Sequence, residues 1–261
     1  MRDAFVGILV VGGATLLEAV RSRILLVSVF FAVLLVGATV AASSISFGEE
    51  GRLIIDVGLA AASAVGSGIA LSLAIASFAG ELRRRTAYSI LARPIPRWAF
   101  VLGKHVGIAV TIDILVGFMV LATVLILWAY GATVPRALWG SLWLSMIEMQ
   151  LVVAVATLFS AFTTPVLAAA FTVGLVLAGN LAGDIARFAA RLEAKGQSGA
   201  DMLRVLYYLL PDLGKLSLRT QAANNLPVDI SYLVYGTTYG LCYAAAALAL
   251  ACWIFSRRRM I

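Results

Sequence analysis

Two acidic residues lie inside long apolar stretches of the sequence, where ionisable side chains are rare. Asp113 lies about two turns into one apolar run, and Glu148 lies near the middle of the next. An acid within a membrane-spanning helix is costly and usually serves ion or substrate passage, so this pair could couple protons or bind a cation. The alternative is that both acids are buried and hydrogen-bonded, with Thr111 or Gln150 as partners, or that Glu148 is protonated because burial removes it from water.

Tyrosines form a second polar pattern near the end of the chain. Tyr232, Tyr235, Tyr239 and Tyr243 recur at three or four residues along one face of the apolar run 230–255. Tyrosine near a membrane interface ordinarily anchors a helix there. Tyr239 and Tyr243 would lie deeper, so we keep a role in a transport pathway or a subunit contact as the alternative.

The sequence carries no phosphate-binding loop of the G-x-x-x-x-G-K-[ST] type. The Gly-Lys pair ending at Lys104 is followed by His105, and the pair ending at Lys215 is followed by Leu216. We therefore expect no catalytic residue and no cofactor in this chain. If ATP and magnesium are involved, they must bind a separate subunit.

The sequence also has few residues that could bind a metal ion. His105 is the single histidine, which excludes the H-E-x-x-H pattern. Cys242 and Cys252 fall in the same apolar run, where a helix would hold them about 15 Å apart. Because this exceeds the reach of a disulfide or of a shared metal, we predict neither.

The composition identifies the kind of fold that must position these residues. Hydrophobic residues make up 62% of the chain and charged residues 13%, whereas soluble domains carry about 25% charged residues. Mean hydropathy is +1.00, and the apolar residues fall into blocks of about 20. The net charge of +7 comes from cations at the ends of these blocks, which favours membrane orientation over nucleic-acid binding.

We predict an all-α polytopic membrane protein with one six-helix transmembrane domain over 24–261. The expected spans are 24–43, 54–80, 106–130, 138–162, 166–185 and 230–255. Residues 1–23 have a short apolar core without a small-x-small cleavage site, so we predict an interfacial elbow helix and not a signal peptide.

Positive charge predicts the orientation of the spans. The segment 81–105 and the chain ends are basic, whereas the short loops on the other side hold only Arg52 and Arg136. By the positive-inside rule, both termini and 81–105 are cytoplasmic, and the long segment 186–229 is extracytoplasmic. Six cations in 186–229 count less, because long loops are weak topology signals. Within it we predict a short surface or re-entrant helix over 201–211.

The segment 81–105 has the composition of a docking surface. Its first half places cations beside apolar side chains and is stopped by a proline. The residues that we expect to dock a partner are Glu81, Arg83, Arg84, Arg85, Tyr88, Leu91, Pro94 and Arg97. The alternative is that these cations only hold anionic lipid headgroups and set the topology.

Small residues recur every four positions in two of the predicted spans. They are Gly58, Ala62, Gly66, Ala70 and Ala74 in the second span, and Gly236, Gly240 and Ala244 in the sixth. Because such spacing lets helix backbones approach closely, we predict tight helix packing there and, as a hypothesis, contact between two subunits.

Several of these features resemble the permease subunits of type-2 ABC transporters, including the copper-assembly permease of the nitrous oxide reductase system. The matches are Glu81, the Arg-Thr pair at 85–86, the Pro-Ile-Pro-Arg motif at 94–97, the Gly-Lys pair at 103–104, and Phe-Ser-Ala-Phe at 159–162. The chain departs from the common family pattern at Arg85, where glycine is usual, and at Pro96, where serine is usual.

The resemblance implies a mechanism that composition alone does not. In such permeases the loop after the second span is a coupling helix that docks on a separate ATPase subunit, and two permeases enclose the pathway. It implies an exporter in a bacterial inner membrane, with a second permease subunit that is either identical or different. A proton-coupled secondary transporter and a non-transporting membrane anchor of an ATPase complex remain as alternatives.

Overall fold

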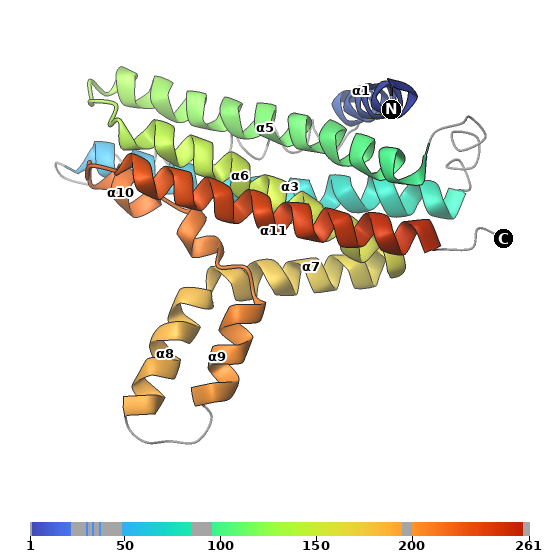
Figure 1. The fold of residues 1–261 in the computed structure, drawn as a ribbon. Coiled ribbons are helices and arrows are strands. Elements are labelled where there is room, and N and C mark those ends of the chain that lie inside the picture. Colours follow the sequence, from blue (N-terminus) through green and yellow to red (C-terminus); the bar gives the residue numbers. More distant parts are fainter. Residues whose placement is uncertain are drawn as a thin grey trace.

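The computed structural model describes residues 2–21, 30, 33, 37, 49–84, 96–194 and 200–257, and the elements in this part of the chain are all helical. Four of its helices are long and apolar enough to cross a membrane, and they run side by side (Figure 1). They are α3 (Glu50–Arg84), α5 (Arg97–Ala129), α6 (Ala137–Phe162) and α11 (Ile230–Arg257). Four of the predicted spans are thereby confirmed as long apolar helices. Of the first predicted span, 24–43, the structure describes only Phe30, Val33 and Gly37. The count of six spans stays a prediction.

The fifth predicted span differs from the expectation. Instead of one helix over 166–185, α7 (Pro165–Asn180) ends early and α8 (Ala182–Ala194) continues at an angle of 57°. At about 24 Å, α7 alone is shorter than a hydrocarbon core of about 30 Å. The helix ends where another segment packs against it, because a Cβ at Gly179 would lie 2.6 Å from the carbonyl oxygen of Pro211.

A helical hairpin projects from the bundle beyond this bend. It consists of α8 and α9 (Ala200–Leu209), which lie side by side below the bundle in Figure 1. α9 confirms the short helix predicted over 201–211. The chain then returns through η1 (Leu213–Leu216) and α10 (Arg219–Ala223) to the end of the bundle where α3 begins.

The N-terminal helix α1 (Arg2–Arg21) packs across the first turns of α5, and Figure 1 shows it nearly end-on while α5 runs across the view. Glycines permit this approach: a Cβ at Gly107 would lie 2.5 Å from the carbonyl oxygen of Gly12, and one at Gly103 would lie 2.8 Å from the Cβ of Val11. The helix predicted over 1–23 is present, and its place in the membrane interface stays a prediction.

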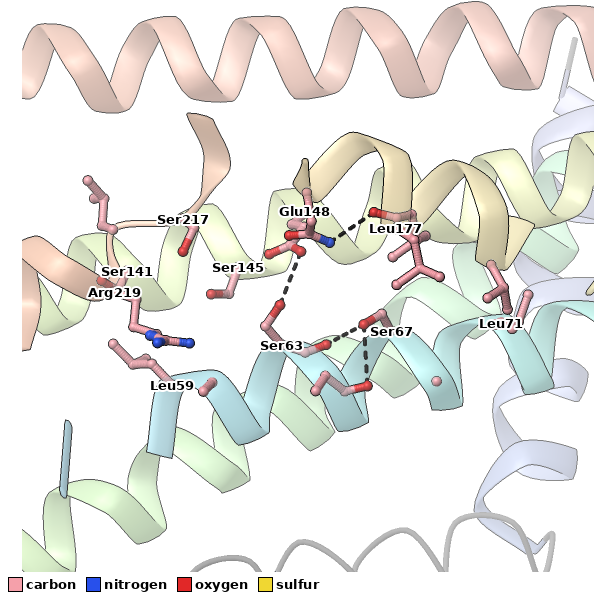
Figure 2. A pocket seen from close by; sticks show the side chains of 17 residues that line it. Leu59, Ser63, Ser67, Leu71, Ser141, Ser145, Glu148, Leu177, Ser217 and Arg219 are labelled. Carbon is pink, nitrogen blue, oxygen red and sulfur yellow. Dashed lines mark hydrogen bonds between the residues drawn. The ribbon is translucent and has the colours of Figure 1, made fainter. Parts of the chain in front are cut away.

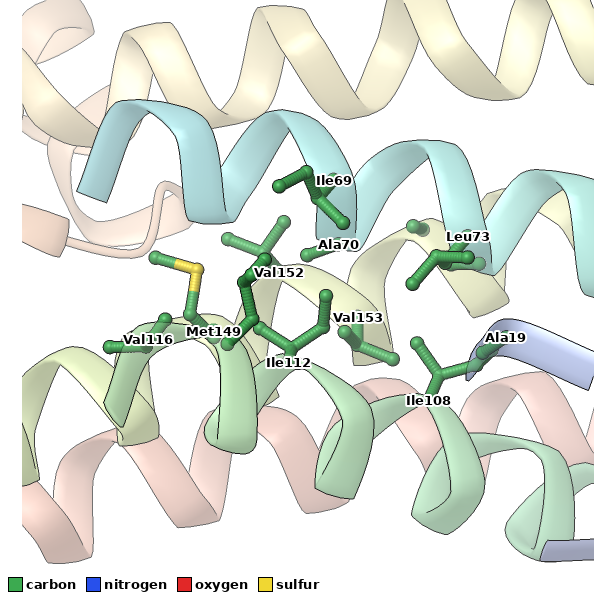
Figure 3. Close-up of a cluster of buried hydrophobic side chains, with 13 residues drawn as sticks. Ala19, Ile69, Ala70, Leu73, Ile108, Ile112, Val116, Met149, Val152 and Val153 are labelled. Carbon is green, nitrogen blue, oxygen red and sulfur yellow. The ribbon is translucent and has the colours of Figure 1, made fainter. Parts of the chain in front are cut away.

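Three spans meet in the apolar core between α3, α5 and α6 (Figure 3). Ala70 and Ala74 of α3 are fully buried there, and the space at Gly66 is closed by Met149 of α6. On α11, Gly240 faces Ile147 of the same chain. The predicted close packing of the small-residue positions is therefore confirmed, but their contacts lie within this bundle. The hypothesis that these helices also contact a second subunit stays a prediction.

Candidate functional site

Glu148 lies inside the bundle and faces α3. It is only 2% exposed, and its Oε1 accepts a hydrogen bond of 3.1 Å from Ser63 Oγ of α3 (Figure 2). Ser141 and Ser145 precede it by seven and three residues on α6, so helical periodicity places all three on one face. The predicted hydrogen bonding of Glu148 is confirmed, although the partner is neither Thr111 nor Gln150.

This polar face borders a cavity of about 440 Å³ between α3, α6, α7 and the segment 217–219. The volume is within the range of small-molecule sites, about 300–1,000 Å³. Its polar lining residues are Ser63, Ser67, Ser141, Ser145, Glu148, Asn180, Ser217 and Arg219. Leucine, valine and alanine side chains form most of the rest of the wall, so the lining is both polar and apolar.

The hydrogen bonds around the cavity leave several oxygen atoms free to accept. Ser67 Oγ donates to the backbone carbonyls of Ser63 and, at 3.3 Å, Ala64. Asn180 uses its side-chain nitrogen to bond the carbonyl of Val176 at 2.9 Å. Ser141 is 2% exposed, and its Oγ has no hydrogen-bond partner. A buried hydroxyl without a partner is costly, which indicates a group that a ligand can satisfy.

One end of the cavity is bordered by an ion pair between α10 and α3. Arg219 Nε lies 2.7 Å from Asp56 Oδ1, and its Nη2 lies 3.4 Å from Oδ2. The guanidinium thus contacts both carboxylate oxygens and fixes the returning segment 217–219 against the start of α3.

Asp113 belongs to a different place in the fold. Its Oδ2 accepts a 2.8 Å hydrogen bond from Gln150 Nε2, which confirms one of the two predicted partners, whereas Thr111 bonds the carbonyl of Gly107. Asp113 Oδ1 is buried without a partner. Since Asp113 is not among the residues that line the cavity, the structure does not bring the two acids into one site.

Tyr239 and Tyr243 also lie away from the cavity, and their rings pack against each other. Tyr239 accepts a 2.8 Å hydrogen bond from the backbone N–H of Asp212, next to η1. Lys215 of η1 donates to Tyr207 at 2.9 Å, and this hydrogen bond is the main cause that raises the pKa of Lys215. These contacts tie the projecting hairpin to α11, and a role of Tyr239 and Tyr243 in a pathway or a subunit contact stays a prediction.

Comparison with protein families matches residues 14–260 to the model described as ABC-2 family transporter protein. The chain belongs to this family. No curated protein matches it. It is therefore an ABC transporter permease and a multi-pass membrane protein, as its apolar helices indicate. The finer similarity to the copper-assembly permease stays a prediction.

In this ABC-2 permease, the predicted coupling loop is shorter than 81–105 because helices enter it from both sides. Glu81, Arg83 and Arg84 belong to the last turn of α3, and α5 begins at Arg97. Arg97 Nη1 donates to the carbonyl of Ser256 at the end of α11, at 3.1 Å. Four predicted docking residues lie outside the described part of the chain; they are Arg85, Tyr88, Leu91 and Pro94.

Sequence reasoning identified Glu148 but missed the groups around it. Ser63 and Ser141 lie on different spans, and serine is too frequent in membrane helices to mark a site by itself. The spacing of Ser141, Ser145 and Glu148 on one helical face was the available signal. Arg219 was counted only as one of the cations of the long segment, because its pairing with Asp56 depends on the return of the chain to α3.

Proposed function

We propose that this ABC-2 permease is the membrane subunit of an ATP-driven exporter and that it pairs with a separate ATPase subunit. The chain lacks a phosphate-binding loop, so ATP and magnesium would bind in that partner. A second permease, identical or different, would complete the pathway. The proposed setting is a bacterial inner membrane with both termini and the segment 85–95 in the cytoplasm.

The observation that carries this proposal is the continuity of α3. This helix runs unbroken from Glu50 to Arg84, carries Ser63 and Ser67 into the cavity wall, and ends at the predicted docking segment. Ser63 and Glu81 are separated by about 27 Å of helix at about 1.5 Å per residue. A displacement of the docking segment by an ATPase would thus move one wall of the cavity as a rigid body.

Export is supported by the arrangement around the cavity. The segment 217–219, which belongs to the long stretch predicted outside, borders it and is held by the ion pair of Arg219 and Asp56. Opening of this segment would release a ligand on the side opposite the proposed ATPase. We include in this proposal a similarity to the copper-assembly permease of the nitrous oxide reductase system, which is an exporter of the same class.

The secondary-transporter alternative is less well supported. A proton relay through the two intramembrane acids needs them in one hydrogen-bonded chain. Glu148 bonds Ser63, whereas Asp113 bonds Gln150 and does not line the cavity. No specific observation favours the non-transporting anchor. An anchor needs no polar cavity inside the bundle, whereas this structure has one.

Co-purification tests the proposed pairing. The tagged permease, extracted from its own cells in mild detergent, should retain a protein that carries the G-x-x-x-x-G-K-[ST] motif. The variant Glu81→Lys with Tyr88→Asp and Leu91→Asp should lose it. The matched control places the same kind of charge on the hairpin at the exposed residues Met202 and Tyr208, and should keep it. Loss of the ATPase from the control alone would contradict the proposal.

A further inference from the structure

The carboxyl group of Glu148 has no cationic partner among the described residues that line the cavity. Among the described residues that line it, the charged ones are Glu148 and Arg219. Arg219 is engaged with Asp56 through two nitrogen atoms. No described Lys, Arg or His side chain forms an ion pair with Glu148. A carboxyl group buried in this way favours a ligand that brings the missing positive charge.

The hydrogen-bonding groups point to the same chemistry. Glu148 offers carboxyl oxygens, Ser67 has already donated its hydroxyl hydrogen to the backbone, and Asn180 keeps its side-chain oxygen as an acceptor. These three residues therefore offer acceptors to a ligand, and Ser141 adds a buried hydroxyl without a partner. A ligand must supply donors to satisfy them. A primary ammonium group carries three donors and one positive charge.

The apolar residues of the lining determine the rest of the ligand. Leu59 and Leu71 of α3 and Val173 and Leu177 of α7 line the cavity together with other apolar side chains. In Figure 2, Leu71 lies at the end of the pocket away from Arg219, Leu177 lies near Glu148 and Ser67, and Leu59 lies near Arg219. A ligand with an apolar body next to its charged group would remove this surface from water, at about 25 cal/mol per Å².

We propose that this cavity binds a small amphiphilic amine, with its ammonium group on Glu148 and its apolar body against α3 and α7. As the substrate class of the exporter, the inference rests on the proposed function. The site itself is defined by residues of this chain alone. It is distinct from Asp113 and Gln150, which do not line the cavity.

Binding of tryptamine to the full-length permease in lipid nanodiscs tests the site, with empty nanodiscs subtracted. The matched neutral probe is tryptophol, which has the same ring and chain but a hydroxyl in place of the ammonium. Wild type should bind tryptamine saturably and tryptophol about tenfold or more weakly. Glu148→Gln, which keeps an acceptor for Ser63, should abolish the preference.

The control variant is Asp113→Asn, which neutralises the other intramembrane acid and should leave tryptamine binding unchanged. The proposal is overturned if wild type shows no saturable tryptamine binding, if tryptophol binds as tightly, or if Glu148→Gln binds like wild type. Should Glu148→Gln fail to insert, the comparison of the two probes on the wild type still decides.

The two proposals fail in different ways, because this binding measurement needs no ATPase. If the permease binds tryptamine but retains no ATPase on co-purification, the exporter proposal is contradicted and the amine site stands. A stable ATPase complex whose permease binds no tryptamine would contradict the amine site alone.

Discussion

Lys104 of α5 lies 3.8 Å from a carboxylate oxygen of Glu18 on α1, and its side chain is only 3% exposed. Its Nζ also lies 3.4 Å from Ser77 Oγ of α3. One buried side chain thus joins the N-terminal helix to the two spans that flank the predicted docking segment. These three helices are therefore positioned to move as a unit when that segment is displaced.

Packing of Lys104, more than its ion pair, should hold this junction together. Lys104→Ala should lower the free energy of unfolding by about 2 kcal/mol, because it empties a filled space between three helices. Glu18→Gln should cost less than about 1 kcal/mol, since the Glu18 side chain is 62% exposed and solvent screens the pair. Thermal unfolding in detergent measures both. Equal losses would show that the ion pair dominates.

The close approach of α1 and α5 should be sensitive to a single methyl group. Gly107→Ala should weaken the docking of α1, because its Cβ would lie 2.5 Å from the carbonyl oxygen of Gly12. Gly13→Ala is the matched control, since nothing lies within 4 Å of a Cβ there and alanine favours helix by about 1 kcal/mol. Proteolysis of α1 under native conditions should accelerate in the first variant only. Equal rates in both would contradict the backbone contact.

The connection between the hairpin and α11 should weaken in strong alkali. The hydrogen bond to Tyr207 raises the pKa of Lys215 above its ordinary value near 10.5. A raised folded-state pKa stabilises the fold fully below the ordinary value, and this contribution is lost as pH rises through the folded-state value. The protection of the α9 amides from hydrogen exchange, measured relative to the intrinsic exchange rate at the same pH, should therefore fall above about pH 10.5 in wild type. In Lys215→Met this protection should be low already at neutral pH, and unchanged protection would contradict the link.

Topology can be tested with single cysteines in a background that lacks Cys242 and Cys252. An impermeant thiol reagent applied to intact cells should label a cysteine at Ser198, in the segment predicted outside, and spare one at Ser89. The opposite labelling pattern would reverse the proposed orientation, and the proposed export direction with it.

The sequence predicted the long helices well because each needs only about 20 apolar residues. It could not predict the end of α7 at Asn180. The apolar run continues past this residue, and the bend accompanies a contact of Gly179 with Pro211, far along the chain. Similarly, the cost of an acid in a membrane identified Glu148, whereas Ser63 became visible as its partner only when α3 was placed against α6. Both the end of α7 and the partner of Glu148 depend on packing between segments that are far apart in the sequence.

The small-residue positions show the same limit. Their spacing correctly predicted close helix contacts, because it depends on the helix alone. The partner of each contact depends on the whole bundle: Gly58 meets Thr123 of α5, and Gly236 meets Leu144 of α6, both within this chain.

The most direct test of the exporter mechanism is ATP hydrolysis by the permease and its ATPase reconstituted together in vesicles. The complex should hydrolyse ATP faster than the ATPase alone, and a protonophore should not change this rate. The variant Glu81→Lys with Tyr88→Asp and Leu91→Asp should return hydrolysis to the rate of the ATPase alone, while the control with charges at Met202 and Tyr208 keeps the increase. An increase that survives in the docking variant, or that vanishes with the protonophore, would contradict coupling through this segment.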